Sequence, residues 1–265
     1  MYRQRVPSAR GYAATLTVIQ TLVEECEHTL GLASRLAVGV GIPGAISRAT
    51  GLVKNANSTH LIGHPLDKDL ARELGCAVRV ENDANCFALS EATDGAGTGS
   101  DVVFGVIAGT GVGAGIVAHG RALGGVNGIG GEWGHNPLPW PRDDERPGPQ
   151  CYCGRRGCIE TWLSGPSLTR DSGLELPAHE IVARPEGSAA LERYIDRFAR
   201  GLAHIINVLD PDVIVLGGGM SNVEALYAEI PKRWAQWIFS DTVETKLRKA
   251  VHGDSSGVRG AAWLC

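Results

Sequence analysis

The stretch Leu36-Ala37-Val38-Gly39-Val40-Gly41-Ile42 is a short apolar run that ends at Pro43-Gly44, and it is typical of a buried strand that leads into a turn. Residues 67–74 follow with helical spacing of apolar residues, Gly75 closes that segment, and residues 77–80 form a second short apolar run. Strand, helix and strand in this order predict two parallel strands. The fold class indicated by this stretch is therefore α/β.

The rest of the chain extends this alternation of helices and strands. Apolar residues at helical spacing over residues 12–30, closed by Gly31, predict an amphipathic helix before the first strand. Residues 101–117 predict a hairpin around a glycine loop. Glycine and proline predict irregular chain over 124–134 and 137–149. We expect further helices over 82–95, 188–209, 223–239 and 256–264, and over 211–219 a buried parallel strand that runs into a glycine turn.

Length and composition exclude several classes of protein. The 265 residues suffice for one large or two small domains. The composition, with 43% hydrophobic and 20% charged residues, is ordinary for a globular protein. A net charge of −4 gives no positive field that would attract nucleic acid or an anionic membrane. Because the chain has neither a long apolar run nor a secretory leader pattern, we expect a cytoplasmic protein without membrane contact.

Three of the seven cysteines form the strongest single motif, Cys151-x-Cys153-x4-Cys158. Thiolates at this spacing are typical ligands of zinc, and Gly154 and Gly157 supply the bends of such a loop. His135 is the best fourth ligand, which would close a structural Cys3His site. The alternative is three unligated thiols on a loop. We interpret the scattered cysteines as small apolar residues without a redox role: Cys26, Cys76, Cys86 and Cys265.

A second motif, Glu81-Asn82-Asp83-Ala84-Asn85, lies where an apolar strand ends and a helix begins. Ligands bind at this edge of a parallel sheet. Asp83 could accept a hydroxyl proton as general base, while Asn82 and Asn85 position the substrate. The alternative is that Asn82 or Asp83 only caps the helix, and the two interpretations are compatible.

Two glycine turns at strand ends could receive a nucleotide. Residues 109–113 read Gly-Thr-Gly-Val-Gly, and residues 217–219 are three glycines. Each would bring backbone N–H groups to a strand end, as phosphate sites do, although plain tight turns would have the same sequence. Polar residues at 55–59, Glu132 and Glu160 could hydrogen-bond a polyhydroxyl ligand, and metal binding at Cys158 would fix the loop that carries Glu160.

The order of these motifs, together with Gly41-Ile42-Pro43-Gly44 and Glu132-Trp133-Gly134-His135, resembles the ROK family of sugar kinases. The resemblance implies an actin-like, ribonuclease-H-like pair of α/β domains around a cleft. We place residues 1–98 with 254–265 in one domain, and residues 99–253 with the zinc loop in the other. Residues 54–59, 136–140 and 252–263 resemble the bacterial fructokinase (manno-fructokinase) branch.

The resemblance also implies a role for each motif. Asp83 would be the catalytic base, ATP with Mg²⁺ would be the phosphoryl donor, zinc would be structural, and the protein would be a homodimer. The implied sugar-binding residues are Gly44, Asn57, Asn82, Asp83, Glu132, His135 and Glu160. The implied nucleotide-binding residues are Gly109, Thr110, Gly111, Val112, Gly113, Ala114, Gly115, Ile116, Gly217 and Gly218. The implied zinc ligands are His135, Cys151, Cys153 and Cys158.

We therefore expect ATP-dependent phosphorylation of a hexose, with fructose or mannose first. One alternative is a glucokinase or an N-acetylhexosamine kinase of the same family. The other is a sugar-binding remnant, because these kinases open with an Asp-x-Gly-Gly-Thr-Lys-like phosphate loop and nothing similar precedes Tyr2. We expect a truncated start, weak or no kinase activity, and an exposed strand edge at residues 36–42.

Overall fold

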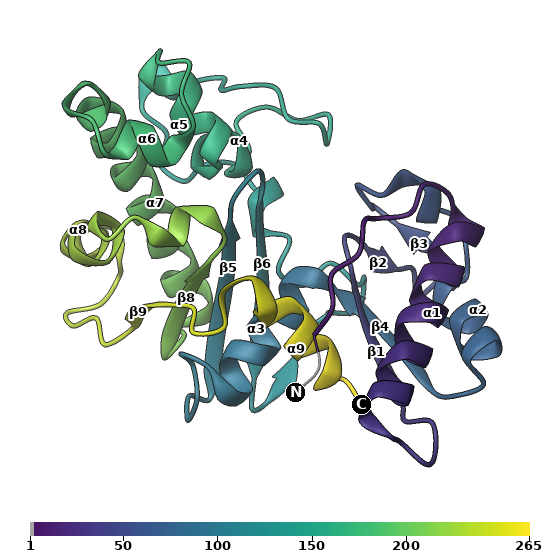
Figure 1. The fold of residues 1–265 in the computed structure, drawn as a ribbon. Coiled ribbons are helices and arrows are strands. Elements are labelled where there is room, and N and C mark those ends of the chain that lie inside the picture. The colour runs from purple at the N-terminus through teal and green to yellow at the C-terminus, as the bar shows by residue number, and fades with distance from the viewer. Residues whose placement is uncertain (1–2) are drawn as a thin grey trace.

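The computed structural model describes residues 3–265, which form two lobes (Figure 1). In the first lobe, strand β1 (Val38–Ile42) pairs in parallel with β4 (Val78–Asn82), so the predicted strand pairing is confirmed. A small antiparallel hairpin, β2 (Ala45–Ile46) with β3 (Val53–Lys54), follows β1.

Helices α1 (Tyr12–Leu30) and α2 (Leu66–Leu74) pack beside these strands. Both end where predicted, because Gly31 and Gly75 adopt the left-handed conformation that stops a helix. Leu66, Leu70 and Leu74 recur every four residues and are buried on one face of α2.

The second edge of β1 has no strand partner among residues 3–265, as expected for the edge at residues 36–42. An apolar groove of about 900 Å³ runs along it between α1 and the C-terminal helix, and Asp83 lies among the residues that line this groove.

The second lobe is built on a five-stranded sheet with the order β7-β6-β5-β8-β9. The predicted hairpin is β5 (Val102–Ala108) with antiparallel β6 (Val112–Ala118), and the predicted buried strand is β8 (Val213–Gly217), parallel to β5. The outer strands β7 (Arg121–Ala122) and β9 (Lys246–Lys249) complete the sheet, and neither was predicted from the sequence.

Residues of β5 alternate between the two faces of this sheet. Phe104 and Val106 belong to the core under α7 (Ser188–Leu209) and α8 (Ala225–Trp234), whereas Val103 faces α3 (Asp83–Asp94). The predicted helix over 223–239 is too long. Helix α8 ends at Trp234, a short 3₁₀ turn (Ala235–Trp237) follows, and the side chain of Phe239 is fully exposed.

The C-terminal helix α9 (Ser256–Ala262) lies between α3 and β1 (Figure 1). Glycines permit this close approach. A Cβ on Gly260 would lie 1.6 Å from the carbonyl oxygen of Cys86 in α3, and a Cβ on Gly39 of β1 would lie 1.7 Å from that of Ala261. The two lobes therefore meet through α9.

Residues 124–149 are irregular as predicted, with only 3₁₀ turns at Trp133–His135 and Asp143–Glu145. The buried Glu145 carboxylate fixes this segment to α7 through ion pairs of 2.8 Å with both Arg197 and Arg200. Burial alone would raise the pKa of Glu145, but hydrogen bonds from the two guanidinium groups lower it to about 2. Three short helices follow: α4 (Glu160–Leu163), α5 (Gly165–Ser172) and α6 (Ala178–Val182).

None of the helices in residues 3–265 is long and apolar enough to cross a membrane. The domain boundaries expected from sequence stay a prediction.

Candidate active site

The end of β4 positions Asp83 as the first residue of α3. Asn82 caps this helix: its Oδ1 accepts hydrogen bonds from the backbone N–H groups of Ala84, at 2.9 Å, and Asn85, at 3.2 Å. The Asn82 amide also donates to the carbonyl oxygen of Gly44, at 3.1 Å, which ties the helix start to the turn after β1. The capping interpretation is thus confirmed for Asn82, and it leaves the Asp83 carboxylate available to a substrate.

Burial raises the pKa of the Asp83 carboxyl. Backbone hydrogen bonds, including one of 2.8 Å from Ala84 N–H, oppose this shift, and the negative charge of Glu132 adds to it. A carboxylate with a raised pKa is a stronger base, which suits a group that must remove a hydroxyl proton.

A cleft of about 810 Å³ lies in front of Asp83. It brings together every side chain and backbone position predicted to bind sugar, and the first five of the predicted nucleotide positions: Gly44, Asn57, Asn82, Asp83, Glu132, His135, Glu160, and Gly109, Thr110, Gly111, Val112 and Gly113. The lining also includes Thr59, from the polar run at 55–59, and residues that sequence reasoning did not assign: Pro43, Ile107, Ile129, Tyr152 and Arg155.

A second cavity, of about 1020 Å³, adjoins this cleft at Gly109 and Thr110. Its remaining lining comes from the segments around α5, α6 and the turn after β8, and includes Gly165, Thr169, His179, Gly219, Met220 and Asn222. Among these residues only Gly219 belongs to a motif found in the sequence, the glycine turn at 217–219. The others were not predicted, because segments distant in sequence supply them.

The other predicted nucleotide positions line neither cavity. Ala114, Gly115 and Ile116 continue along β6, where a Cβ on Gly115 would lie 2.4 Å from the carbonyl oxygen of Ala84 in α3. A Cβ on Gly217 would lie 2.4 Å from the ring of Phe87, and one on Gly218 would lie 2.4 Å from the carbonyl oxygen of Ala108. These contacts give Gly115 and Gly217 a packing role against α3, and their contact with a nucleotide stays a prediction.

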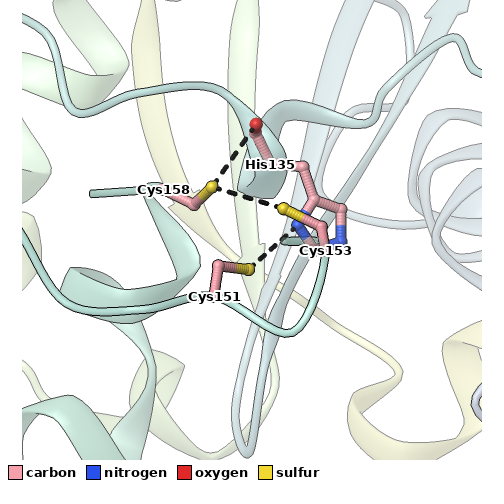
Figure 2. A group of neighbouring side chains, drawn as sticks. All are labelled: His135, Cys151, Cys153 and Cys158. Carbon is pink, nitrogen blue, oxygen red and sulfur yellow. Dashed lines mark hydrogen bonds between the residues drawn. The ribbon is translucent and has the colours of Figure 1, made fainter. Parts of the chain in front are cut away.

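The predicted metal ligands converge (Figure 2). His135 Nδ1 lies 3.6 Å from Cys151 Sγ, Cys153 Sγ lies 3.6 Å from Cys158 Sγ, and the four ligand atoms all lie within 4.8 Å of one another. A tetrahedral zinc ion with Zn–S bonds of about 2.3 Å would separate its sulfur ligands by about 3.8 Å. The donor set and its spacing therefore fit zinc.

The thiols of this cluster are free of disulfide bonds. Burial raises the pKa of Cys151, and it raises that of Cys158 to about 12. A bound cation would offset this effect, because a coordinating thiol is deprotonated by the metal charge.

Glu160 links the metal loop to the glycine hairpin. Its Oε2 accepts a hydrogen bond of 3.1 Å from the N–H of Val112, at the start of β6, and its Oε1 lies 3.9 Å from Cys151 Sγ. On the same loop, the Tyr152 hydroxyl lies 2.8 Å from His135 Nε2. Partial desolvation of the phenol, together with the charges of Glu160 and Glu132, raises the pKa of Tyr152 to about 12.

The chain is similar in sequence to known sugar kinases. Over 278 aligned residues the chain is 40% identical to the N-acetyl-D-glucosamine kinase of Yersinia pseudotuberculosis, covering 100% of this chain and 91% of the relative. It is 38% identical to the enzyme of the same name from Salmonella typhimurium, covering 99% of this chain and 91% of the relative.

Solved structures resemble it along almost its whole length. A ROK hexokinase from Thermus thermophilus superposes with a TM-score of 0.84 at 29% identity, covering 97% of this chain and 87% of that one. A ROK glucokinase from Streptomyces griseus, in complex with glucose and AMPPNP, gives 0.79 at 26% identity, with 98% and 90% covered. The actin-like, ribonuclease-H-like fold expected from the sequence is confirmed. The ROK family model matches residues 1–265, and the chain belongs to the ROK family.

Proposed function

We propose that this protein transfers the γ-phosphoryl group of ATP to a hydroxyl of an N-acetylhexosamine, with N-acetyl-D-glucosamine as the first choice. The observation that carries this proposal is the position of Asp83, a carboxylate of raised pKa in a cleft that also holds Glu132, Glu160 and the glycine hairpin. Identity of 40% to an N-acetyl-D-glucosamine kinase, over 100% of this chain and 91% of the relative, supports the N-acetylhexosamine alternative better than fructose or mannose.

The sugar would occupy the cleft in front of Asp83. The reacting hydroxyl gives its proton to the Asp83 carboxylate as its oxygen attacks the γ-phosphorus. Glu132 and Glu160 accept hydrogen bonds from other sugar hydroxyls, while Asn57 and the turn at Gly44 border the same space. Asn82 holds this turn through its 3.1 Å bond to the Gly44 carbonyl.

The nucleotide would occupy the adjoining cavity, with its phosphates directed toward the sugar at Gly109 and Thr110, which line both spaces. Backbone N–H groups of the glycine hairpin would then face the transferring phosphoryl group. The carboxylates of the cleft are the ligand type that Mg²⁺ prefers, and Mg²⁺ bound with ATP neutralises charge on the phosphoryl oxygens.

His135, Cys151, Cys153 and Cys158 would hold a structural zinc ion. All four positions are protein ligands, so the site would be closed and would have no place for a reacting water. Its effect is to fix the loop that presents His135 and Glu160 to the cleft. The homodimer and the cytoplasmic location expected from the sequence stay predictions.

A coupled assay of ADP release tests the proposal with ATP, Mg²⁺ and N-acetylglucosamine, N-acetylmannosamine, glucose, mannose or fructose. We expect the largest kcat/KM with an N-acetylhexosamine. A preference for fructose or mannose would contradict N-acetylhexosamine specificity and support a kinase of the fructokinase branch. Calorimetric sugar binding is measured in parallel, because binding without turnover of any sugar would favour the sugar-binding remnant and contradict a kinase.

A further inference from the structure

Tyr152 lines the proposed sugar cleft and has no role in the phosphoryl transfer proposed above. It stands between Cys151 and Cys153, so a metal bound to these thiols would fix its backbone on both sides. Its side chain lines the cleft and Tyr152 is 71% exposed, so a ligand can reach it. Its ring meets that of His135 edge-on, with the ring centroids 5.0 Å apart.

The hydrogen bond between Tyr152 and His135 has a definite direction when His135 is a metal ligand. Nδ1 of His135 points to Cys151 Sγ at 3.6 Å, which is the metal side. A neutral imidazole that coordinates through Nδ1 carries its proton on Nε2. Nε2–H then donates to the Tyr152 oxygen at 2.8 Å.

A phenol that accepts this bond keeps its own O–H for another partner, because a tyrosine oxygen has one proton and two lone pairs. Three of the side chains expected to hold sugar hydroxyls, Asp83, Glu132 and Glu160, are carboxylates that accept hydrogen bonds. Asn57, Asn82 and Arg155 also carry N–H donors in this cleft, and the Asn82 amide already donates to the Gly44 carbonyl. Tyr152 therefore adds a neutral donor, oriented by His135, to a cleft rich in acceptors.

An acetamido group differs from a hydroxyl in this respect. A sugar hydroxyl can donate to a carboxylate, whereas the acetamido carbonyl oxygen only accepts. We propose that Tyr152 is a specificity-determining residue whose hydroxyl donates to the carbonyl oxygen of the substrate's N-acetyl group. This inference rests on the proposed function and deepens it.

The Tyr152→Phe substitution in the full chain tests it, because phenylalanine keeps the ring against His135 and removes only the hydroxyl. Binding of N-acetylglucosamine and of glucose is measured by calorimetry without ATP, kcat/KM is measured for both sugars, and zinc content is measured by metal analysis. We expect N-acetylglucosamine to bind about 3- to 10-fold more weakly, glucose to change less than about 2-fold, and zinc content to stay the same.

The matched control is Tyr12→Phe, which removes a phenol hydroxyl that donates to Asp69 at 2.6 Å in the first lobe. It should leave the affinities for both sugars unchanged. Equal losses for the two sugars, no loss, tighter binding of N-acetylglucosamine, or loss of zinc in Tyr152→Phe would each overturn the proposal. If the wild-type chain phosphorylates neither N-acetylglucosamine nor N-acetylmannosamine, the proposed function fails. If it phosphorylates either sugar and Tyr152→Phe keeps the wild-type preference, only this inference fails.

Discussion

At the scale of single residues, Asp83 shows how a helix start can serve both structure and chemistry. Asn82 provides the cap through its side-chain oxygen, and Asp83 begins the helix with its carboxylate in the cleft. Burial and the nearby charge of Glu132 disfavour the ionised form and raise its pKa.

A pH dependence of activity follows from this shift. A general base works only when ionised, so activity should be lost as the pH falls through the raised pKa of Asp83. The acid limb of kcat/KM for the preferred sugar should therefore lie above the ordinary aspartate value of about 3.9. Glu132→Gln removes the adjacent charge and should move that limb to lower pH. An acid limb at or below about 4 in the wild-type chain would contradict the role of Asp83.

The site residues were predictable to different degrees. The structure brings together the residues of the strand-end motif and those of the cysteine motif, because both motifs have a spacing with a direct geometric meaning. Gly115 and Gly217, which are predicted nucleotide positions, also make room for α3 and for Phe87. Sequence alone does not separate these two uses, because both require the absence of a Cβ. Tyr152 occupies the unspecified position between two cysteines, so no rule could select it.

At the scale of elements, the loop that contains the cysteine cluster is the part whose order would depend on the proposed metal ion. Its segment from 135 to 158 has little regular structure, so four metal bonds would replace the hydrogen bonds of a helix or a sheet.

Zinc removal should therefore destabilise this loop. We expect about one zinc ion per chain in purified protein, and a lower melting temperature with faster proteolysis within residues 135–158 after chelation. Cys151→Ser should reproduce the effect without a chelator, while Cys265→Ser, at an exposed position outside the cluster, should not. Protein that contains no zinc and melts at the same temperature with and without chelator would refute the site.

The buried carboxylate of Glu145 should contribute strongly to stability. Glu145→Gln leaves Arg197 and Arg200 without its charge, and removing one partner of a buried ion pair costs about 3–5 kcal/mol. The control Asp143→Asn lies on the same turn with a fully exposed side chain and should cost less than about 1 kcal/mol. Urea unfolding measures both, and similar small losses in the two variants would contradict the account.

The pH dependence of this contribution has a defined sign. Because the folded pKa of Glu145 is lowered to about 2, its contribution is present above the ordinary carboxyl pKa of about 4.3 and is lost as the pH falls toward 2. The free energy of unfolding of Glu145→Gln should consequently vary less across this range than that of the wild type.

Most long elements were predictable because their apolar periodicity is strong. Helices α1, α2 and α7 follow a 3.6-residue pattern, and α1 and α2 end at glycine. Strand β9 was missed because Lys246–Lys249 is an edge strand with mostly exposed residues and so has no apolar run. The end of α8 was placed too late because the apolar residues after Trp234 continue in a 3₁₀ turn instead of an α-helix.

At the scale of the whole molecule, the two lobes are joined through glycine contacts. Helix α9 packs on α3, which carries Asp83, and on β1, which leads to the turn at Gly44. The sequence predicted α9 as a helix but gave no indication that it lies between the lobes, because that placement depends on contacts between segments distant in the chain.

A side chain at Gly260 should disturb this joint. A Cβ there would lie 1.6 Å from the carbonyl oxygen of Cys86, so Gly260→Ala forces α9 and α3 apart and should destabilise the protein by about 1–3 kcal/mol. Gly257→Ala is the matched control in the same helix, because a Cβ at Gly257 meets nothing within 4 Å. It should be neutral or stabilise by up to about 1 kcal/mol. A melting temperature that is lower for Gly257→Ala than for Gly260→Ala would contradict the close packing of α9 on α3.

The most direct test of Asp83 as the general base compares the wild-type chain with Asp83→Asn in the ADP-release assay, with ATP, Mg²⁺ and saturating N-acetylglucosamine. Calorimetry of sugar binding and metal analysis establish that both proteins are folded and loaded with zinc. We predict that Asp83→Asn lowers kcat by about 10²- to 10⁴-fold while it still binds the sugar. Equal turnover in the two proteins would show that Asp83 is not the base and would contradict the account.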